Sequence, residues 1–218
     1  RLREERMLPF LLDTGQVTPA MMSELAELLA RFHADAERAT GIDPAHYPAL
    51  VQAQWSDNLT DFARVSNPII DAENCLAVEK FGAEFFARHS ETLKRRAARG
   101  WLRDVHGDLH TEHVCFAPEG IQIFDCIEFE PKFRQCDLAA EIAFLIMDIE
   151  VRGGATLIAP FLQRYRQLID DPEADDLLPF WKCYRALVRA KVYALRGVSG
   201  LDMASRYARY ASGLAWTP

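Results

Sequence analysis

The sequence lacks several features by which whole classes of protein are recognised. It contains no run of Lys and Arg long enough to follow a phosphate backbone, and its 25 basic residues are outnumbered by 32 acidic ones, for a net charge of −7. Nucleic acid is therefore not an expected partner. No apolar run approaches the roughly 18 residues that a membrane-spanning helix needs, so no membrane partner is expected either.

Cysteine is scarce and scattered. The five cysteines are an odd number and include no C-x-x-C spacing, which argues against a disulfide framework and against a zinc site. This usage is typical of a reducing compartment, and we expect a cytoplasmic protein. A chain of 218 residues is long enough to bury a sizeable core, and we interpret residues 1–218 as a single domain.

Helical periodicity dominates the chain. Thr18 and Pro19 form an N-cap and a first helical position, and apolar residues recur on one face over residues 18–36. Residues 71–100 form a second long periodic segment that a glycine ends, and a third begins at Asp137. Three further helices are expected at residues 157–169, 178–196 and 203–214.

The pattern changes to short strands over residues 101–136. Residues 101–105 are typical of a short strand, and residues 114–117 and 121–124 flank a Pro-Glu-Gly turn, which predicts a hairpin. We therefore expect a mainly α fold of the α+β type, with a small β-hairpin beside the segment His-Gly-Asp-Leu-His-Thr-Glu-His at residues 106–113.

This β segment carries a high density of carboxylate and imidazole side chains. Asp108 lies on a loop between strands, and Asp125 lies at the end of the second hairpin strand. A hairpin brings its two ends together, so we expect Asp108, His113 and Asp125 to converge. Two carboxylates and a third ligand are what a divalent cation and a phosphoryl group require, because phosphoryl transfer depends mainly on positioning and charge neutralisation.

The motifs HGDLHTEHV and FDCIEF resemble the catalytic and metal-binding segments of the aminoglycoside phosphotransferase and choline kinase-like family. Its members are small-molecule kinases with a protein-kinase-like fold. The chain is similar in particular to a bacterial branch that reads HGDLHxEN and FDCIEF and can carry an extra P-loop ATP-binding domain. The similarity continues through LLARFH, CDLAAEIAFLIMDIEVRG and YRALVRAKVYALRG, and so covers nearly all of the chain. It implies ATP-dependent transfer of a γ-phosphate to a hydroxyl of an acceptor that the sequence does not identify.

The resemblance also implies roles for individual residues. Asp108 matches the catalytic Asp that orients or deprotonates the acceptor hydroxyl, and His106 matches the loop His that supports it. Asp125 matches the Asp that binds Mg²⁺ between the nucleotide phosphates, and His113 occupies the position of the second metal ligand. Asp137 matches the Asp at the start of a helix that ties down the catalytic loop, which is compatible with an ordinary N-cap role.

The sequence departs from the family pattern in two ways. His113 replaces an Asn, and imidazole is a poorer ligand for Mg²⁺ than an amide oxygen, so Mn²⁺ is the alternative metal. The chain also contains no Gly-rich phosphate loop, no Lys-bearing strand and no P-loop motif. We therefore interpret it as a protein-kinase-like C-terminal lobe. Residues 1–17 lead in from a missing N-terminal β-lobe, residues 101–136 form the catalytic and metal-binding segment, and that lobe and a P-loop domain are expected partners in the full-length protein.

Several alternatives remain open. Glu128 is either a contact to a second metal or part of a salt bridge at the hairpin end, and His110 is either a packed loop histidine or a ligand. The His and Asp residues at 106–113 also suit a transition-metal site in a metal-dependent hydrolase. The third alternative is a non-catalytic kinase-like module that binds a nucleotide or a partner.

Overall fold

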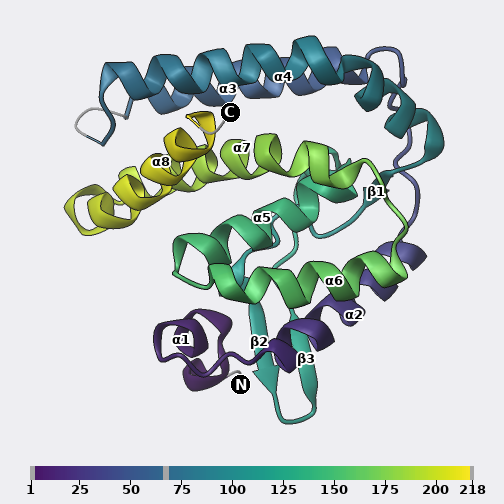
Figure 1. Ribbon diagram of the computed structural model, residues 1–218, viewed down its shortest axis with the longest axis vertical. Helices are drawn as coiled ribbons and strands as arrows, with labels where there is room; N and C mark the ends of the chain where they lie inside the picture. The colour runs from purple at the N-terminus through teal and green to yellow at the C-terminus, as the bar shows by residue number, and fades with distance from the viewer. Residues whose placement is uncertain (1–2, 66–68, 217–218) are drawn as a thin grey trace. The chain divides into compact units, whose positions relative to one another are not determined.

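A computed structural model describes residues 3–65 and 69–216 (Figure 1). The chain divides into two compact units, Arg1–Thr40 with Leu102–Ala174 and Gly41–Trp101 with Asp175–Pro218. Helices account for most of the described residues, and the strands form small antiparallel sheets. The expected mainly α fold with a small β component is therefore confirmed.

The first unit is built around one buried helix. It contains α1 (Leu8–Asp13), α2 (Pro19–Asp35), α5 (Leu138–Val151) and α6 (Ile158–Leu168), and α2 packs along α6 (Figure 1). Residues on all sides of α5 are buried. A helix that is buried all round forms a core rather than covering one, so α5 is the central element against which the rest of this unit is fixed.

The strands of this unit form two antiparallel pairs. The hairpin consists of β2 (Val114–Ala117) and β3 (Gly120–Ile123), as the sequence predicts. The strand expected at residues 101–105 is β1 (Leu102–Asp104), and it pairs with β4 (Gln135–Asp137). The sequence did not predict β4, because three polar or small residues show no period. This pairing sets the start of α5 opposite the start of β1.

The second unit is helical throughout its described residues. It contains α3 (Tyr47–Ala63), α4 (Ala72–Arg99), α7 (Ala174–Ala194) and α8 (Leu201–Ala215), with α3 and α8 both packed on α4 (Figure 1). Aromatic rings fill its core, and those of Phe85 and Phe180 stack with centroids 3.8 Å apart. Gly82 admits the indole of Trp55, since a Cβ at this position would lie 2.3 Å from Trp55 Nε1.

The predicted helix boundaries are confirmed at several caps. The Thr18 side chain accepts a hydrogen bond from the backbone of Met21, and Asp71 caps α4 in the same way. Gly100 ends α4 with φ +81°, a conformation that favours glycine. Helix α3 was not predicted. Its buried stripe includes Asn58 and is flanked by polar residues, so the apolar period is weak.

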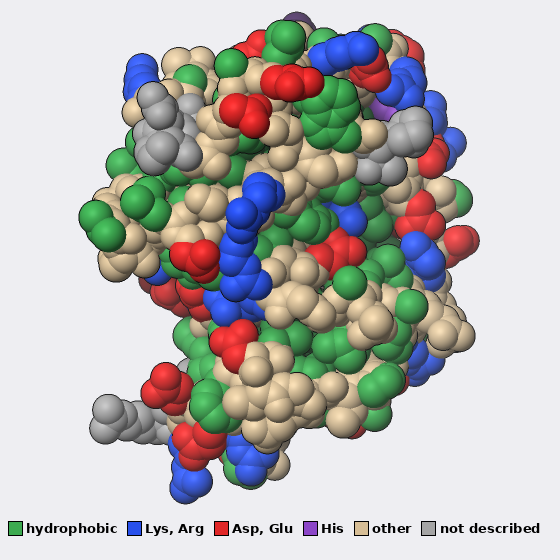
Figure 2. All heavy atoms as spheres, turned by 60° about the vertical axis from the view of Figure 1, so that its left-hand side comes forward, with side chains coloured by type: hydrophobic (Ala, Val, Ile, Leu, Met, Phe, Trp, Pro, Cys, Tyr) green, Lys and Arg blue, Asp and Glu red, His purple; other side chains and the backbone are tan. Residues whose placement is uncertain are grey.

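The surface carries charges of both signs. On the face drawn in Figure 2, Lys and Arg side chains lie among Asp and Glu side chains rather than in one continuous basic track. Within the described ranges, no helix combines the length and the apolar character that crossing a bilayer would demand.

Candidate active site

The segment between β1 and β2, in the first unit, carries the predicted site, and α5 holds its backbone. The buried carboxylate of Glu141 accepts hydrogen bonds from the backbone N–H of His106, at 2.9 Å, and of Gly107, at 3.2 Å. Further along the helix, the buried carboxylate of Asp148 accepts the backbone N–H of Thr111 at 2.9 Å and its hydroxyl at 2.5 Å. Two acids from the core therefore fix the loop on either side of Asp108.

Gly107 is required by the close approach of a second loop. Its φ is +81°, and a Cβ at this position would lie 2.6 Å from the carbonyl oxygen of Phe133. A side chain here would both strain the backbone and collide with a main-chain atom. The backbone before Asp108 is thus shaped by the segment that leads into β4.

The buried imidazole of His106 links the two halves of the site. Its Nε2 donates to the carbonyl of Phe124 at 2.8 Å, and its Nδ1 accepts from the backbone N–H of Asp108 at 3.3 Å. Burial lowers the pKa of His106, which favours the neutral ring that can donate at one nitrogen and accept at the other. One side chain therefore joins the loop of Asp108 to the residue that precedes Asp125.

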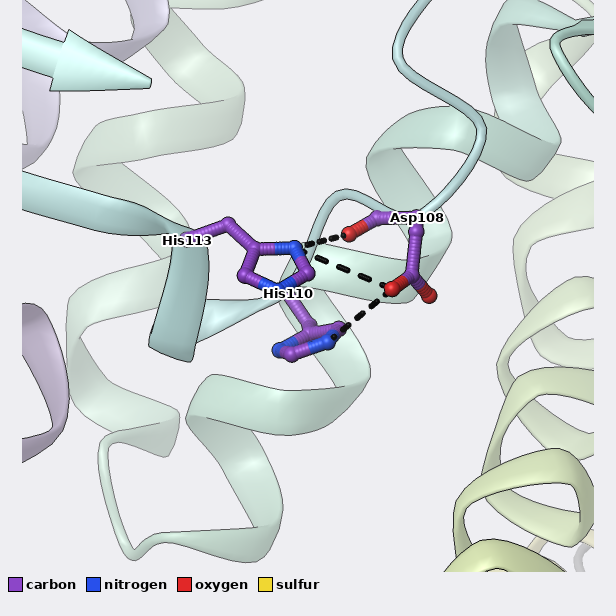
Figure 3. A group of neighbouring side chains, drawn as sticks. All are labelled: Asp108, His110 and His113. Carbon is purple, nitrogen blue, oxygen red and sulfur yellow. Dashed lines mark hydrogen bonds and ion pairs between the residues drawn. The ribbon is translucent and has the colours of Figure 1, made fainter. Parts of the chain in front are cut away.

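Two further histidines surround the carboxylate of Asp108, as Figure 3 shows. His110 Nε2 lies 3.4 Å and His113 Nδ1 lies 3.8 Å from Asp108 Oδ2, while His113 Nδ1 also donates to the backbone carbonyl of Asp108 at 2.9 Å. The two imidazole rings pack with centroids 4.0 Å apart. Both rings are buried, whereas the Asp108 side chain is 39% exposed, so the carboxylate is held from within and open to solvent.

Asp125 completes the cluster from the end of the hairpin. It has φ +63°, in the left-handed region, and its side chain is 76% exposed. Its Oδ2 atom lies 3.4 Å from His113 Nε2. The ring of His113 therefore lies between Asp108 and Asp125, and the convergence of these three residues that the sequence predicts is observed.

The arrangement can hold a divalent metal ion. Ligand atoms of Asp108, His110 and His113 all lie within 4.8 Å of one another, and Nε2 of His113, the nitrogen that does not donate to Asp108, lies 3.4 Å from Asp125 Oδ2. Two imidazoles and a carboxylate suit Mn²⁺ or Zn²⁺, while carboxylate oxygens alone are what Mg²⁺ prefers. The donor set thus fits a divalent cation. His110 is one of its possible ligands as well as a buried histidine of the loop.

The remaining candidates lie outside this cluster. Asp137 is buried and caps α5 by accepting the backbone N–H of Ala139 at 2.8 Å, as its expected N-cap role requires. Glu128 is exposed, and its carboxylate forms no ion pair with any residue in the ranges 3–65 and 69–216. The hydrogen bond of Asp104, with a smaller contribution from the charge of Glu128, raises the pKa of Arg134.

Glu141 and Asp148 were not predicted as residues of the site. Both lie in a helix that is otherwise almost entirely apolar and buried. A carboxylate on such a helix needs hydrogen-bond donors, and their spacing of four and eleven residues from Asp137 is the signal that could have identified them.

Comparison with known proteins gives relatives of uncharacterized function and a structural likeness to kinases. No family model matches the chain. It is 30% identical over 200 residues to uncharacterized proteins of Mycobacterium tuberculosis and Mycobacterium bovis, a match that covers 92% of this chain but 40% of each relative. The chain therefore spans less than half the length of these curated relatives.

The fold is similar to that of a glucosamine kinase, with a TM-score of 0.55 and 19% identity over 89% of this chain and 52% of that chain. A glucosamine kinase solved with glucosamine, ADP and inorganic phosphate gives a TM-score of 0.52 over 89% of this chain and 53% of that one. At this identity the likeness is one of fold. The likeness agrees with the expected fold, while the protein-kinase-like C-terminal lobe and membership of the aminoglycoside phosphotransferase branch stay predictions.

Proposed function

We propose that this chain is the catalytic part of an ATP-dependent small-molecule kinase of the aminoglycoside phosphotransferase type, which transfers the γ-phosphate to a hydroxyl of its acceptor. One observation carries the proposal. The solvent-accessible carboxylate of Asp108 lies on a loop anchored to the core and is connected through His113 to the exposed carboxylate of Asp125. The fold it shares with a glucosamine kinase solved with ADP and phosphate supports it.

In this proposal Asp108 acts on the acceptor. A carboxylate that is held from within and open to solvent can accept the hydrogen bond of an incoming hydroxyl and orient its oxygen toward the phosphorus. His110 and His113, which contact the carboxylate from the buried side, keep it in that orientation. His106 links the same loop to the carbonyl of Phe124 and so fixes the position of Asp108 relative to Asp125.

Asp125 and His113 would hold the metal that accompanies the nucleotide. When bound, a divalent ion neutralises the charge of the phosphates during transfer. The exposed Asp125 carboxylate suits either Mg²⁺ or Mn²⁺, and the imidazole of His113 favours Mn²⁺. Because the chain spans 40% of its curated relatives, we further propose that another lobe and a P-loop domain of the complete protein complete the ATP site.

A measurement of phosphotransfer in the complete protein tests this function. ADP release from ATP would be followed with Mn²⁺ and with Mg²⁺, against a panel of amino sugars, aminoglycosides and choline, in the wild type, in Asp108→Asn and in the matched control Asp57→Asn, an exposed carboxylate on α3. We expect ADP release that depends on one class of acceptor and is lost only in Asp108→Asn. ADP release that no acceptor stimulates, or that Asp108→Asn retains, would contradict the proposal.

The second candidate is a metal-dependent hydrolase, and the compact set of Asp108, His110 and His113 favours it. Two imidazoles and one carboxylate are the protein ligands of several catalytic zinc sites, which keep a fourth position for water. Metal analysis of the purified protein separates the two candidates. Stoichiometric zinc that is retained without nucleotide supports the hydrolase, whereas metal that binds only together with a nucleotide supports the kinase.

A further inference from the structure

The segment that follows Asp125 is tied back to the sheet by one side chain, Arg134. Its guanidinium donates to both carboxylate oxygens of Asp104, from Nε at 2.7 Å and from Nη2 at 3.1 Å. Its third nitrogen, Nη1, donates to the backbone carbonyl of Ile127 at 2.9 Å. Arg134 therefore connects β1, just before the catalytic loop, to the backbone two residues after Asp125.

Asp125 itself has a conformation that needs such support. A non-glycine residue at φ +63° has an energetic cost, and it persists where the surrounding contacts fix the backbone. On the N-terminal side, Phe124 is fixed by the His106 ring, which donates to its carbonyl. On the C-terminal side, Ile127 donates to the carbonyl of His106 at 3.2 Å and accepts from Arg134.

We propose that Arg134 is a positioning residue, which holds Asp125 in its left-handed conformation and so directs its carboxylate toward His113. The inference rests on the proposed function insofar as Asp125 is taken to bind the metal of the metal–nucleotide complex. A charge-assisted hydrogen bond is stronger than a neutral one, and a guanidinium whose Nε and Nη2 are both bound by one carboxylate donates to Ile127 from a fixed position.

The surroundings of the Arg134–Asp104 pair allow it to be altered without collapse of the fold. The two side chains are 24% and 28% exposed, and both line a pocket of about 550 Å³ together with Ile123, Cys126 and apolar residues of α2. No close-packed core surrounds the guanidinium, so a shorter side chain leaves space that solvent can fill. The hydrogen bond of Asp104 raises the pKa of Arg134, whose guanidinium is charged at working pH in any case.

Hydrogen exchange tests the positioning role without reference to activity. In the complete protein, the hydrogen-bonded amides of Phe124 and Ile127 should exchange roughly tenfold faster in Arg134→Gln than in the wild type, because the loss of a charge-assisted bond favours local opening. The matched control is Arg164→Gln, which breaks another half-exposed ion pair of the same unit, with Glu27 at 2.8 Å. Unchanged exchange of the Phe124 and Ile127 amides in Arg134→Gln, or an equal increase in Arg164→Gln, overturns the proposal.

Metal binding tests the connection to Asp125. The concentration of Mn²⁺ that half-saturates the complete protein in the presence of ADP, followed by the paramagnetic resonance signal of free Mn²⁺, should rise roughly tenfold in Arg134→Gln and less than about twofold in Arg164→Gln. Faster exchange with an unchanged half-saturating concentration overturns the positioning role. A wild type that binds no Mn²⁺ with ADP counts against the proposed function, and the exchange measurement then still decides the role of Arg134.

A second variant tests the same interaction should Arg134→Gln fail to fold. Asp104→Asn weakens the Arg134–Asp104 pair from its other partner and should shift both measurements in the same direction.

Discussion

The Nε2 atom of His113 lies 3.4 Å from Oδ2 of Asp125. Because the other ring nitrogen donates to the carbonyl of Asp108, Nε2 is the nitrogen that is available to a ligand on the Asp125 side. Two ligand atoms at this separation can share one ion, since each would lie about 2.0–2.2 Å from it. His113, the residue at which the sequence departs from the pattern it resembles, is therefore the side chain that contacts both carboxylates.

Exchange of His113 for Asn should change the metal preference of the enzyme. We expect the wild type to turn over faster with Mn²⁺ than with Mg²⁺, and His113→Asn to reverse that order, because an amide oxygen replaces an imidazole nitrogen. Turnover of the complete protein with each metal gives the ratio, and His46→Asn, which alters an exposed histidine of the second unit, is the control. A metal ratio that is the same before and after His113→Asn means that His113 is not a ligand.

Substitution of Asp108 should lower the turnover number and leave the affinity for ATP nearly unchanged. An amide cannot take the proton of the acceptor hydroxyl, so Asp108→Asn should lower kcat by about 10² or more. The affinity for ATP should stay within about twofold, because this side chain acts on the acceptor. Single-turnover kinetics and equilibrium titration with ATP separate the two quantities. Retention of more than about a tenth of the wild-type turnover would show that Asp108 is not the base.

Much of this arrangement could be predicted from local sequence, because the signals were local. The cap at Thr18, the ends of the helix predicted at residues 71–100 and the Pro-Glu-Gly turn of the hairpin are decided by a few neighbouring residues, and the structure confirms them. The convergence of Asp108 with Asp125 followed from the geometry of any two-stranded hairpin. In these cases the residues that determine the local structure lie in the same short segment as the structure itself.

The parts that escaped prediction depend on contacts between distant segments. Strand β4 forms because β1 offers it hydrogen bonds, and its own three residues carry no pattern. In the sequence Glu141 resembles any acidic residue of a helix. Its role depends on a hydrogen bond from the backbone of His106, which is 35 residues away. Arg134 is likewise held by Asp104, which is 30 residues away. Local sequence patterns do not indicate which distant residues form such pairs.

Glu141 should matter for both the fold and the turnover. Replacement by Gln puts an amide where two backbone N–H groups need an acceptor, which should lower the free energy of unfolding by about 2 kcal/mol. Because those N–H groups belong to the loop of Asp108, kcat should fall more than the KM for ATP changes. Urea unfolding and steady-state kinetics of Glu141→Gln, compared with the exposed Glu24→Gln on α2, test this. Lower stability with an unchanged kcat would confine Glu141 to a structural role.

His33 should make the stability of the protein sensitive to acid. Its ring is completely buried on α2, where Nδ1 forms a 2.7 Å hydrogen bond with the hydroxyl of Tyr165, and burial lowers its pKa from 6.5 to about 3. The unfolded chain therefore takes up a proton near pH 6.5 that the folded protein refuses until about pH 3. The contribution of His33 to stability is complete above pH 6.5 and is lost progressively as the pH falls toward 3, by about 3 kcal/mol at pH 4.5.

The variant His33→Asn tests this effect, because Asn keeps a polar atom near the position of Nδ1 but does not titrate. Between pH 7 and pH 4.5 it should lose less stability than the wild type, as measured by urea unfolding followed by circular dichroism. The exposed control His46→Asn should follow the wild type. An equal loss in His33→Asn and the wild type would mean that the proton is taken up elsewhere.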